Sequence, residues 1–458
     1  MPKIKISKPV LLILLLIIAA HIFVLSKLIF FPYPEFFIYP YLTNGGLIPY
    51  KQIFDQHFPG LMFFPLNFAS LGMTTAQSAR IWSWGIVAVE QVLIFLVAQR
   101  LLKSDKKALL ANFIFLVWHP FFEGWVFWID SILPVFLLGA LFFLVSQEER
   151  KSSLFLSGLL LGLASVFKQV VIPLALLVAA GIYIRGRKPS SLIYFLSGFL
   201  PFPALMVIYF WRLGALKDFW YWTVTYNFTV FAKYGGQSAT PSQIIRVLFV
   251  YGLSLFVLLE SKARKLSFWL FVFLLGGLVS VLARFDFVHL QPSLPFVVVL
   301  GALSILFLYY NKTLRILLPA YILGTIYLLG VFYNSHLGSR VLFFDEATYK
   351  IVEKVREITY SGEKIFIYAA PAHLYQLSQT MPAGDVFILH FPWFFRVSEG
   401  KILEGIKKDK PRVIVADRSV EIQGEKIVDS SPNIVSYILE NYRLADKIGE
   451  TEILIRRE

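Results

Sequence analysis

The chain has 458 residues, of which 57% are hydrophobic and only 16% are charged, and its mean hydropathy is +0.68. Soluble globular proteins carry about 25% charged residues, so the composition excludes that class and indicates a polytopic membrane protein. The formal net charge is +14, but lysine and arginine gather in short segments between apolar runs. That pattern is typical of the charge bias that orients membrane proteins, and we expect no nucleic-acid partner.

The chain contains no cysteine, which excludes disulfides, zinc-thiolate sites and thiol nucleophiles. Its first apolar run follows three basic residues, Lys3, Lys5 and Lys8. This run is longer than the roughly 7 to 15 residues of a signal-peptide core and lacks a small-residue cleavage site. We therefore expect a retained anchor with a cytoplasmic amino terminus.

Later apolar runs alternate with basic clusters, and a span needs about 20 mostly apolar residues. The predicted spans are 9–31, 79–99, 108–122, 126–146, 154–168, 169–184, 191–212, 246–260, 266–284, 292–310 and 315–334. About eleven crossings place the carboxyl terminus outside the cell. The expected fold class is a mainly α, polytopic transmembrane helical bundle in the plasma or inner membrane.

The composition changes at about residue 339. DEATYKIVEKVREI and NIVSYILENY have helical periodicity, while KIFIYAA, DVFILHF, RVIVAD and TEILIRRE are typical of strands. Strands that alternate with helices predict a small α/β unit with a mostly parallel sheet. We expect a membrane domain at 1–338 and a soluble extracytoplasmic domain at 339–458.

The segment from Tyr33 to Gly60, directly after the first span, carries acidic, imidazole and aromatic groups. Glu35 and Asp55 are the candidate catalytic carboxylates, because a carboxylate in a partly desolvated outer cavity can act as a general base. His57 and Tyr50 are the candidate substrate-binding residues. The alternative for either acid is a solvated loop carboxylate.

Four cationic or imidazole side chains are candidates for binding an anionic group such as phosphate: Arg80, Lys168, Arg284 and His289. Lys168 interrupts a long apolar run, where a lone ammonium is unfavourable. Its alternative is snorkelling to the interface. For Arg80 the alternative is an interfacial anchor, and for His289 a satisfied buried histidine.

Three further acids, Glu123, Asp130 and Asp286, fall in or beside outer loops. For these we favour the simpler interpretation, solvated loop carboxylates. The sequence contains no P-loop, no dinucleotide-binding glycine motif after a strand, no HExxH and no GxSxG. This argues against a nucleotide-driven pump, a metalloprotease and a serine hydrolase, and the α/β tail is expected to be a non-catalytic cap.

Several motifs together resemble the GT-C membrane glycosyltransferases, in particular the bacterial group of protein mannosyltransferases and aminoarabinose transferases. They are PEFFIYPYLTNGGLIPYKQIFDQHFPG after the first span, Arg80 opening the second, LGLASVFKQ, and ARFDFVHLQPSLP. The family's first outer loop usually begins with an acidic pair, whereas this sequence has Pro34 before Glu35. The resemblance leaves the base open between Glu35 and Asp55.

The resemblance implies inverting transfer of a sugar from a polyprenyl-phosphate donor to an extracytoplasmic glycan, lipid or protein. Lys168, Arg284 and His289, with Arg80 as a weaker candidate, would hold the carrier phosphate. No nucleotide cofactor is implied. A divalent cation is left open, since two acids can share one but no ligand spacing identifies a metal site. The alternatives are a transporter or flippase of lipid-linked sugars and a non-catalytic membrane scaffold.

Overall fold

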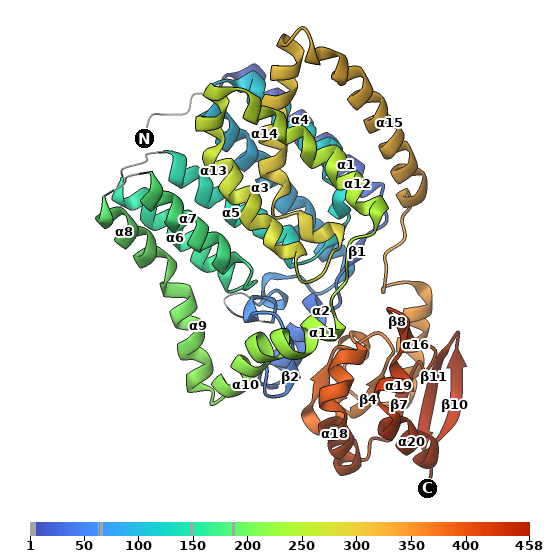
Figure 1. Cartoon of the computed structure of the whole chain (residues 1–458). Helices are drawn as coiled ribbons and strands as arrows, with labels where there is room; N and C mark the ends of the chain where they lie inside the picture. Colours follow the sequence, from blue (N-terminus) through green and yellow to red (C-terminus); the bar gives the residue numbers. More distant parts are fainter. Residues whose placement is uncertain (1–5, 63, 65–66, 147–149, 186–187) are drawn as a thin grey trace. The chain divides into compact units, whose positions relative to one another are not determined.

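The computed structural model describes residues 6–62, 64, 67–146, 150–185 and 188–458 (Figure 1). Two of the basic residues expected to flank the first span, Lys3 and Lys5, lie outside the described residues. The described chain is mostly helical, and its longer strands follow residue 360. The mainly α class predicted from composition is therefore confirmed.

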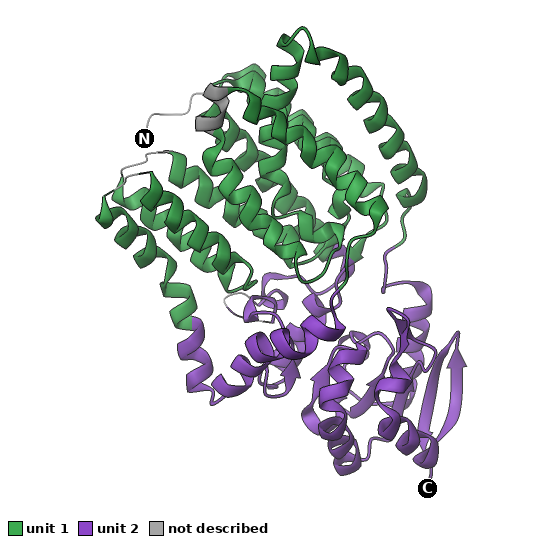
Figure 2. Ribbon diagram, in the orientation of Figure 1, with its two compact units in different colours: residues 1–31, 79–205, 237–340 green, residues 32–78, 206–236, 341–458 purple. Residues whose placement is uncertain are grey.

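The chain divides into two compact units, each built from three segments that are distant in the sequence (Figure 2). Unit 1 comprises residues 1–31, 79–205 and 237–340, and unit 2 comprises 32–78, 206–236 and 341–458. The first loop thus belongs to the same unit as the carboxyl-terminal segment. Where the membrane domain ends, expected at residue 338, stays a prediction.

Helices occupy each of the predicted spans. They are α1 (Lys8–Ser26), α3 (Ala76–Leu102), α4 (Asp105–Trp118), α5 (Ile129–Ser146), α6 (Lys151–Ser165), α7 (Val171–Ile184), α8 (Pro189–Phe199), α9 (Pro201–Arg212), α12 (Pro241–Tyr251), η6 (Gly252–Leu259), α13 (Ser261–Leu278), α14 (Leu294–Tyr310) and α15 (Leu317–His336). In the described chain, five helical stretches are long and apolar enough to cross a membrane: Lys8–Ser26, Ala76–Leu102, Pro189–Arg212, Pro241–Leu259 and Leu314–His336. Other apolar helices are shorter, so the number of crossings stays a prediction.

Close helix packing in unit 1 fixes the turn that carries Lys168. Gly158 and Gly162 on α6 face α8, and a Cβ at either position would lie 2.1 Å from a carbonyl oxygen of α8. Small residues four apart let two membrane helices approach at backbone distance. Because α6 ends at Ser165, only three residues before Lys168, this packing also sets where the turn begins.

Unit 2 gathers short elements from the first loop and from the segment before α12. These are α2 (Glu35–Asn44), β2 (Ile53–Phe54), α10 (Leu216–Trp220), η4 (Tyr221–Thr225), η5 (Asn227–Phe231) and α11 (Ala232–Tyr234). Both η4 and η5 are π-helical. The turn after α2 uses Gly46 at φ 95°, in the left-handed region that favours glycine.

The carboxyl-terminal part of unit 2 has the predicted α/β content. Its helices are α16 (Glu346–Ile358), α17 (Leu374–Ser378), α18 (Pro392–Asp409), α19 (Ile427–Ser430) and α20 (Pro432–Asn441), and its strands are β4 (Lys364–Tyr368), β5 (Met381–Pro382), β6 (Phe387–Ile388), β7 (Val413–Ala416), β8 (Glu421–Ile422), β9 (Glu425–Lys426), β10 (Tyr442–Ile448) and β11 (Thr451–Arg456). The five-stranded sheet has the order β10-β11-β7-β4-β5.

The prediction of a mostly parallel sheet is wrong. Strands β7, β4 and β5 are parallel, but β10 and β11 are antiparallel to each other and β11 is antiparallel to β7. The reason is a tight hairpin between β10 and β11, which turns at Gly449 with φ 60°. The predicted strand DVFILHF forms only β6, which pairs with β2 of the first loop instead of joining this sheet.

Candidate active site

Glu35 is the first residue of α2, so its carboxyl group lies at a helix N-terminus, where negative charge is favoured. The side chain is nevertheless buried, with 5% exposed. Burial raises the pKa of Glu35 to about 8; a hydrogen bond from its own backbone N–H opposes the rise, and the charge of Asp55 adds to it. At neutral pH this carboxyl group is largely protonated. Its pKa is close to neutral pH, as suits a group that exchanges protons.

Asp55 is completely buried and its carboxylate accepts three hydrogen bonds. The Tyr39 hydroxyl donates to Oδ2, while the His57 backbone N–H (2.5 Å) and ring Nδ1 (2.9 Å) donate to Oδ1. Burial and the charge of Asp55 raise the pKa of Tyr39 well above 10, so the phenol keeps its proton and acts as a donor. Each oxygen of the Asp55 carboxylate thus has at least one donor, and these hydrogen bonds hold the side chain in place.

The two predicted substrate-binding residues take part in the same network. The Tyr50 hydroxyl donates to the His57 carbonyl oxygen at 2.7 Å, and the Tyr50 ring packs between Phe210 and Phe219. Tyr50 also has φ 64°, a sterically costly backbone conformation for a bulky residue. The structure thus places both residues around Asp55, and their contact with substrate stays a prediction.

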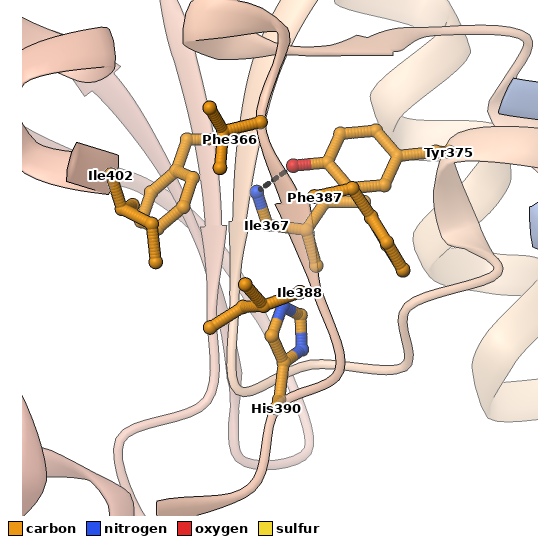
Figure 3. A pocket seen from close by; sticks show the side chains of 8 residues that line it. Phe366, Ile367, Tyr375, Phe387, Ile388, His390 and Ile402 are labelled. Atoms are coloured by element: carbon orange, nitrogen blue, oxygen red, sulfur yellow. Dashed lines mark hydrogen bonds between the residues drawn. The ribbon is translucent and has the colours of Figure 1, made fainter. Parts of the chain in front are cut away.

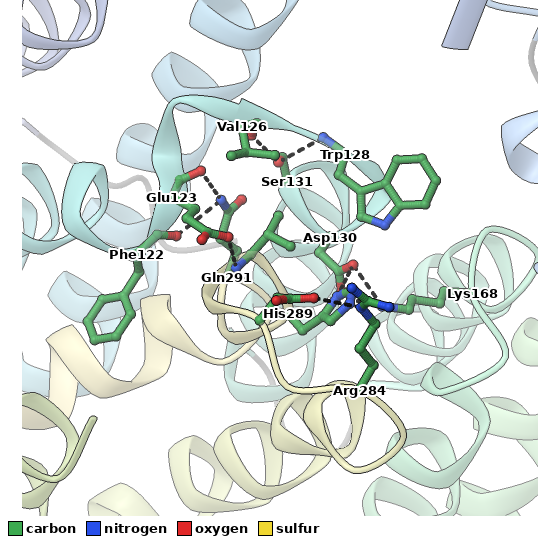
Figure 4. A network of polar contacts seen from close by, with 12 residues as sticks. Phe122, Glu123, Val126, Trp128, Asp130, Ser131, Lys168, Arg284, His289 and Gln291 are labelled. Carbon is green, nitrogen blue, oxygen red and sulfur yellow. Dashed lines mark hydrogen bonds and ion pairs between the residues drawn. The ribbon is translucent and has the colours of Figure 1, made fainter. Parts of the chain in front are cut away.

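In unit 1 the structure brings Lys168 and His289 together around Asp130 (Figure 4). Lys168 Nζ lies 2.7 Å from each oxygen of Asp130 and 3.3 Å from His289 Nδ1, which is itself 2.9 Å from Asp130 Oδ2. Burial and the Lys168 charge lower the pKa of His289, so its ring is neutral at neutral pH. The interpretation of Asp130 as a solvated carboxylate is wrong, because its side chain is completely buried.

Glu123 connects two loops of unit 1 (Figure 4). Its carboxylate accepts the Val288 N–H at 2.7 Å, and Gln291 Nε2 donates to its backbone oxygen at 2.8 Å. Burial raises the pKa of Glu123 to about 7, and the residue has φ 59° inside a π-helical turn. Glu123 is therefore half-buried and hydrogen-bonded, which corrects the expectation of a fully solvated side chain only in part.

The two arginines of the predicted phosphate site have different surroundings. Arg284 Nε lies 2.8 Å from Asp286 Oδ2, and both side chains are about 30% exposed. Asp286 is thus partly solvated, as expected. Arg80 lies over the Phe30 ring at 5.0 Å, and within the described chain its buried Nη2 has no hydrogen-bond partner. The Nη2 group of Arg80 is consequently available to donate a hydrogen bond to a ligand.

Sequence reasoning did not identify Tyr39 as a partner of Asp55, nor Gln291 as a partner of Glu123. Both residues lie within segments that resemble the glycosyltransferase motifs, but neither carries a charge that would mark it as a candidate. One local signal existed, because Tyr39 lies one helical turn after Glu35 on α2. Gln291 gives no comparable signal, since its partner lies 168 positions away.

A small cavity in unit 2 lies outside this site (Figure 3). It has room for about one water molecule, and its lining is mostly apolar, with Phe366, Phe387 and Ile402 among the residues. Its one imidazole, His390, has a pKa lowered to about 4 by burial. Among the described residues, no group of three or more histidines and acids lies close enough to hold a metal ion.

The fold is similar to the folds of two solved proteins, ArnT and the oligosaccharyltransferase AglB, which confirms at the level of the fold the resemblance expected from the sequence motifs. The crystal structure of ArnT from Cupriavidus metallidurans bound to undecaprenyl phosphate matches with a TM-score of 0.62 over 98% of both chains, at 10% identity. The oligosaccharyltransferase AglB from Archaeoglobus fulgidus, in complex with an inhibitory peptide and a dolichol-phosphate, matches with a TM-score of 0.54 at 13% identity. This match covers 97% of the present chain and 74% of AglB.

No model of a protein family and no curated protein sequence matches the chain. At 10 to 13% identity, the similarity to ArnT and AglB concerns the fold. Function has to be argued from the residues.

Proposed function

We propose that this protein is a multi-pass membrane glycosyltransferase that moves a sugar from a polyprenyl-phosphate donor to an extracytoplasmic acceptor. The observation that carries the proposal is the GT-C fold along almost the whole chain, shared with an ArnT whose structure holds undecaprenyl phosphate. The apolar helices support a location in the inner membrane. In this proposal the amino terminus is cytoplasmic and the carboxyl-terminal segment extracytoplasmic.

Glu35 is the general base in this proposal. The carboxylate of the other candidate, Asp55, already accepts three hydrogen bonds. These contacts suit a structural role. Glu35 accepts a hydrogen bond from its own backbone N–H, and within the described chain no side chain donates to it. With a pKa of about 8, its ionised form is a stronger base than an ordinary carboxylate.

The reaction is a single displacement with inversion. The acceptor hydroxyl attacks the anomeric carbon, its proton passes to the Glu35 carboxylate, and the bond from the anomeric carbon to the carrier phosphate breaks. The electron pair of that bond stays on polyprenyl phosphate. Cationic side chains stabilise the charge that develops on the leaving phosphate.

The contacts of Lys168 suggest how it would receive that phosphate. An ammonium group has three N–H donors, and the neighbours of Lys168 are the two Asp130 oxygens at 2.7 Å and His289 Nδ1 at 3.3 Å. The contact with His289 is the longest and involves a neutral group, so it is the one that a phosphate oxygen would replace. Arg80, with its unpaired Nη2, is a second donor for the phosphate.

The proposal is tested by incubating the purified protein in lipid with a panel of polyprenyl-phosphate sugars and measuring sugar release or transfer. We expect turnover of at least one donor, lost in Lys168→Ala. Movement of the carrier across vesicles without turnover of any donor would instead favour a transporter or flippase. Absence of both would leave the non-catalytic scaffold.

A further inference from the structure

Tyr226 lies between two π-helical segments of unit 2, η4 (Tyr221–Thr225) and η5 (Asn227–Phe231). π-Helical turns are rare, and they occur often at functional sites because they displace a side chain from its regular position. Asn227 fixes this segment, since its side-chain amide donates to the Thr223 and Gln56 carbonyl oxygens, both at 2.9 Å. The segment is thereby attached to the residue that follows Asp55.

The Tyr226 side chain is completely buried among aromatic rings. Its ring is stacked on Phe394 at 5.2 Å and tilted against Trp222 at 4.9 Å, and Trp222 is stacked on Phe54, the residue before Asp55, at 4.6 Å. Within the described chain the Tyr226 hydroxyl has no hydrogen-bond partner. A buried hydroxyl without a partner costs about 1–3 kcal/mol, so folding alone does not account for it.

The charges around this hydroxyl indicate which ligand it fits. Burial raises the pKa of Tyr226, with smaller contributions from Tyr221 and from the charge of Asp55, so the phenol remains a neutral donor. The negative charge of Asp55, which acts on Tyr226, disfavours an anionic ligand beside this hydroxyl. The hydroxyl is neutral and lies among aromatic rings, so it suits a neutral ligand that accepts a hydrogen bond.

We propose that the Tyr226 hydroxyl is a substrate-binding group that donates a hydrogen bond to a hydroxyl oxygen of a carbohydrate. This inference rests on the proposed function, since the carbohydrate is either the donor sugar or the acceptor. Trp393, the residue directly before Phe394 on α18, supports it. Its indole Nε1 is also buried and has no partner in the described chain, so the region presents a second unused donor.

The test compares Tyr226→Phe, which removes only the hydroxyl, with the wild type. Because the hydroxyl has no partner, its removal should leave the melting temperature of the ligand-free protein unchanged or raise it. The kcat/KM for sugar transfer should fall roughly 10-fold, as expected for the loss of one hydrogen bond to substrate. Tyr221→Phe, on the same segment but partly exposed, is the matched control and should behave like the wild type.

Ligand-induced shifts in melting temperature locate the contact on the sugar. Undecaprenyl-phosphate mannose and undecaprenyl-phosphate glucose should stabilise the wild type more than Tyr226→Phe, whereas bare undecaprenyl phosphate should stabilise both equally. Hydrolysis of the donor by water distinguishes the two sources of the hydroxyl. A defect that persists in hydrolysis assigns Tyr226 to the donor sugar, and one confined to transfer onto methyl glycosides assigns it to the acceptor.

Two results would overturn the inference. If the wild type turns over donors and Tyr226→Phe matches it in kcat/KM and in every ligand-induced shift, Tyr226 does not bind substrate, although the proposed function holds. If the wild type neither turns over any donor nor is stabilised more by sugar-bearing carriers than by the bare carrier, the proposed function fails and the inference fails with it.

Discussion

Glu35 and Asp55 differ in the groups around their carboxyl oxygens. The fully buried Asp55 carboxylate accepts hydrogen bonds from Tyr39 and His57, whereas Glu35 has its pKa raised to about 8 by burial. We therefore propose proton transfer as the role of Glu35 and support of the first loop as the role of Asp55.

Asp55→Asn tests the supporting role. The amide has one acceptor oxygen for three donors, and its NH2 group would face one of them, so we expect a loss of about 1–3 kcal/mol in the free energy of unfolding. Thermal unfolding in detergent at pH 7 measures it. Glu35→Gln is the control and should melt like the wild type, because glutamine resembles the protonated acid. Equal melting temperatures for Asp55→Asn and the wild type would contradict this role.

The buried pair of Asp130 and Lys168 gives a second prediction at this scale. Asp130→Asn leaves the ammonium group buried without its counter-charge, and breaking a buried pair costs about 3–5 kcal/mol. The matched control is Asp286→Asn, whose partner Arg284 is partly exposed and whose loss should cost less than about 1 kcal/mol. Chemical unfolding in lipid of the two variants checks the difference, and equal effects would argue against a structural pair at Asp130.

At the scale of elements, the close approach of α6 and α8 controls where the Lys168 turn begins. Both helices carry glycines at the contact, and a Cβ on Gly198 of α8 would lie 2.0 Å from the Phe155 carbonyl oxygen. Such a clash involves backbone on both sides, so no side-chain rotation relieves it. Changes at this contact should therefore affect Lys168, which we propose binds phosphate, as well as stability.

Gly162→Ala is the corresponding test. The new Cβ would lie 2.1 Å from the Phe199 carbonyl oxygen, so the helices must separate, and we expect a lower melting temperature together with weaker binding of undecaprenyl phosphate. Gly85→Ala on α3 is the control, because a Cβ there meets no atom within 4 Å and alanine is the better helix former. A Gly162→Ala protein that melts and binds like the wild type would show that the contact tolerates a methyl group.

At the scale of the whole molecule, local patterns predicted the helices but not the partners of distant residues. Apolar runs located the helices, and the apolar surroundings of Lys168 indicated that a lone ammonium group there is unfavourable. Nothing local identified that partner as Asp130, because the pairing forms only when α5 and α6 pack. In the same way, β6 has the composition of a sheet strand, but its partner β2 lies more than 300 residues earlier.

The candidate residues were likewise predicted more completely than their roles. Residue type and position were enough to propose both first-loop acids and all four phosphate candidates, and their roles stay predictions. The sequence could not separate Glu35 from Asp55, because the difference depends on three hydrogen bonds and on burial. The mixed sheet was missed since the hairpin between β10 and β11 reverses the chain at a single glycine, Gly449.

The most direct test of the central claim is the pH dependence of sugar transfer by the wild type and Glu35→Gln, with a donor identified from the panel. The Glu35 carboxyl group is protonated below its pKa of about 8 and accepts a proton only when ionised, so the wild-type rate should rise with pH through about 8 and then level off. Glu35→Gln should lose about 10²- to 10⁴-fold in rate. A Glu35→Gln protein as active as the wild type, or a rate that falls as the pH rises towards 8, would contradict the assignment.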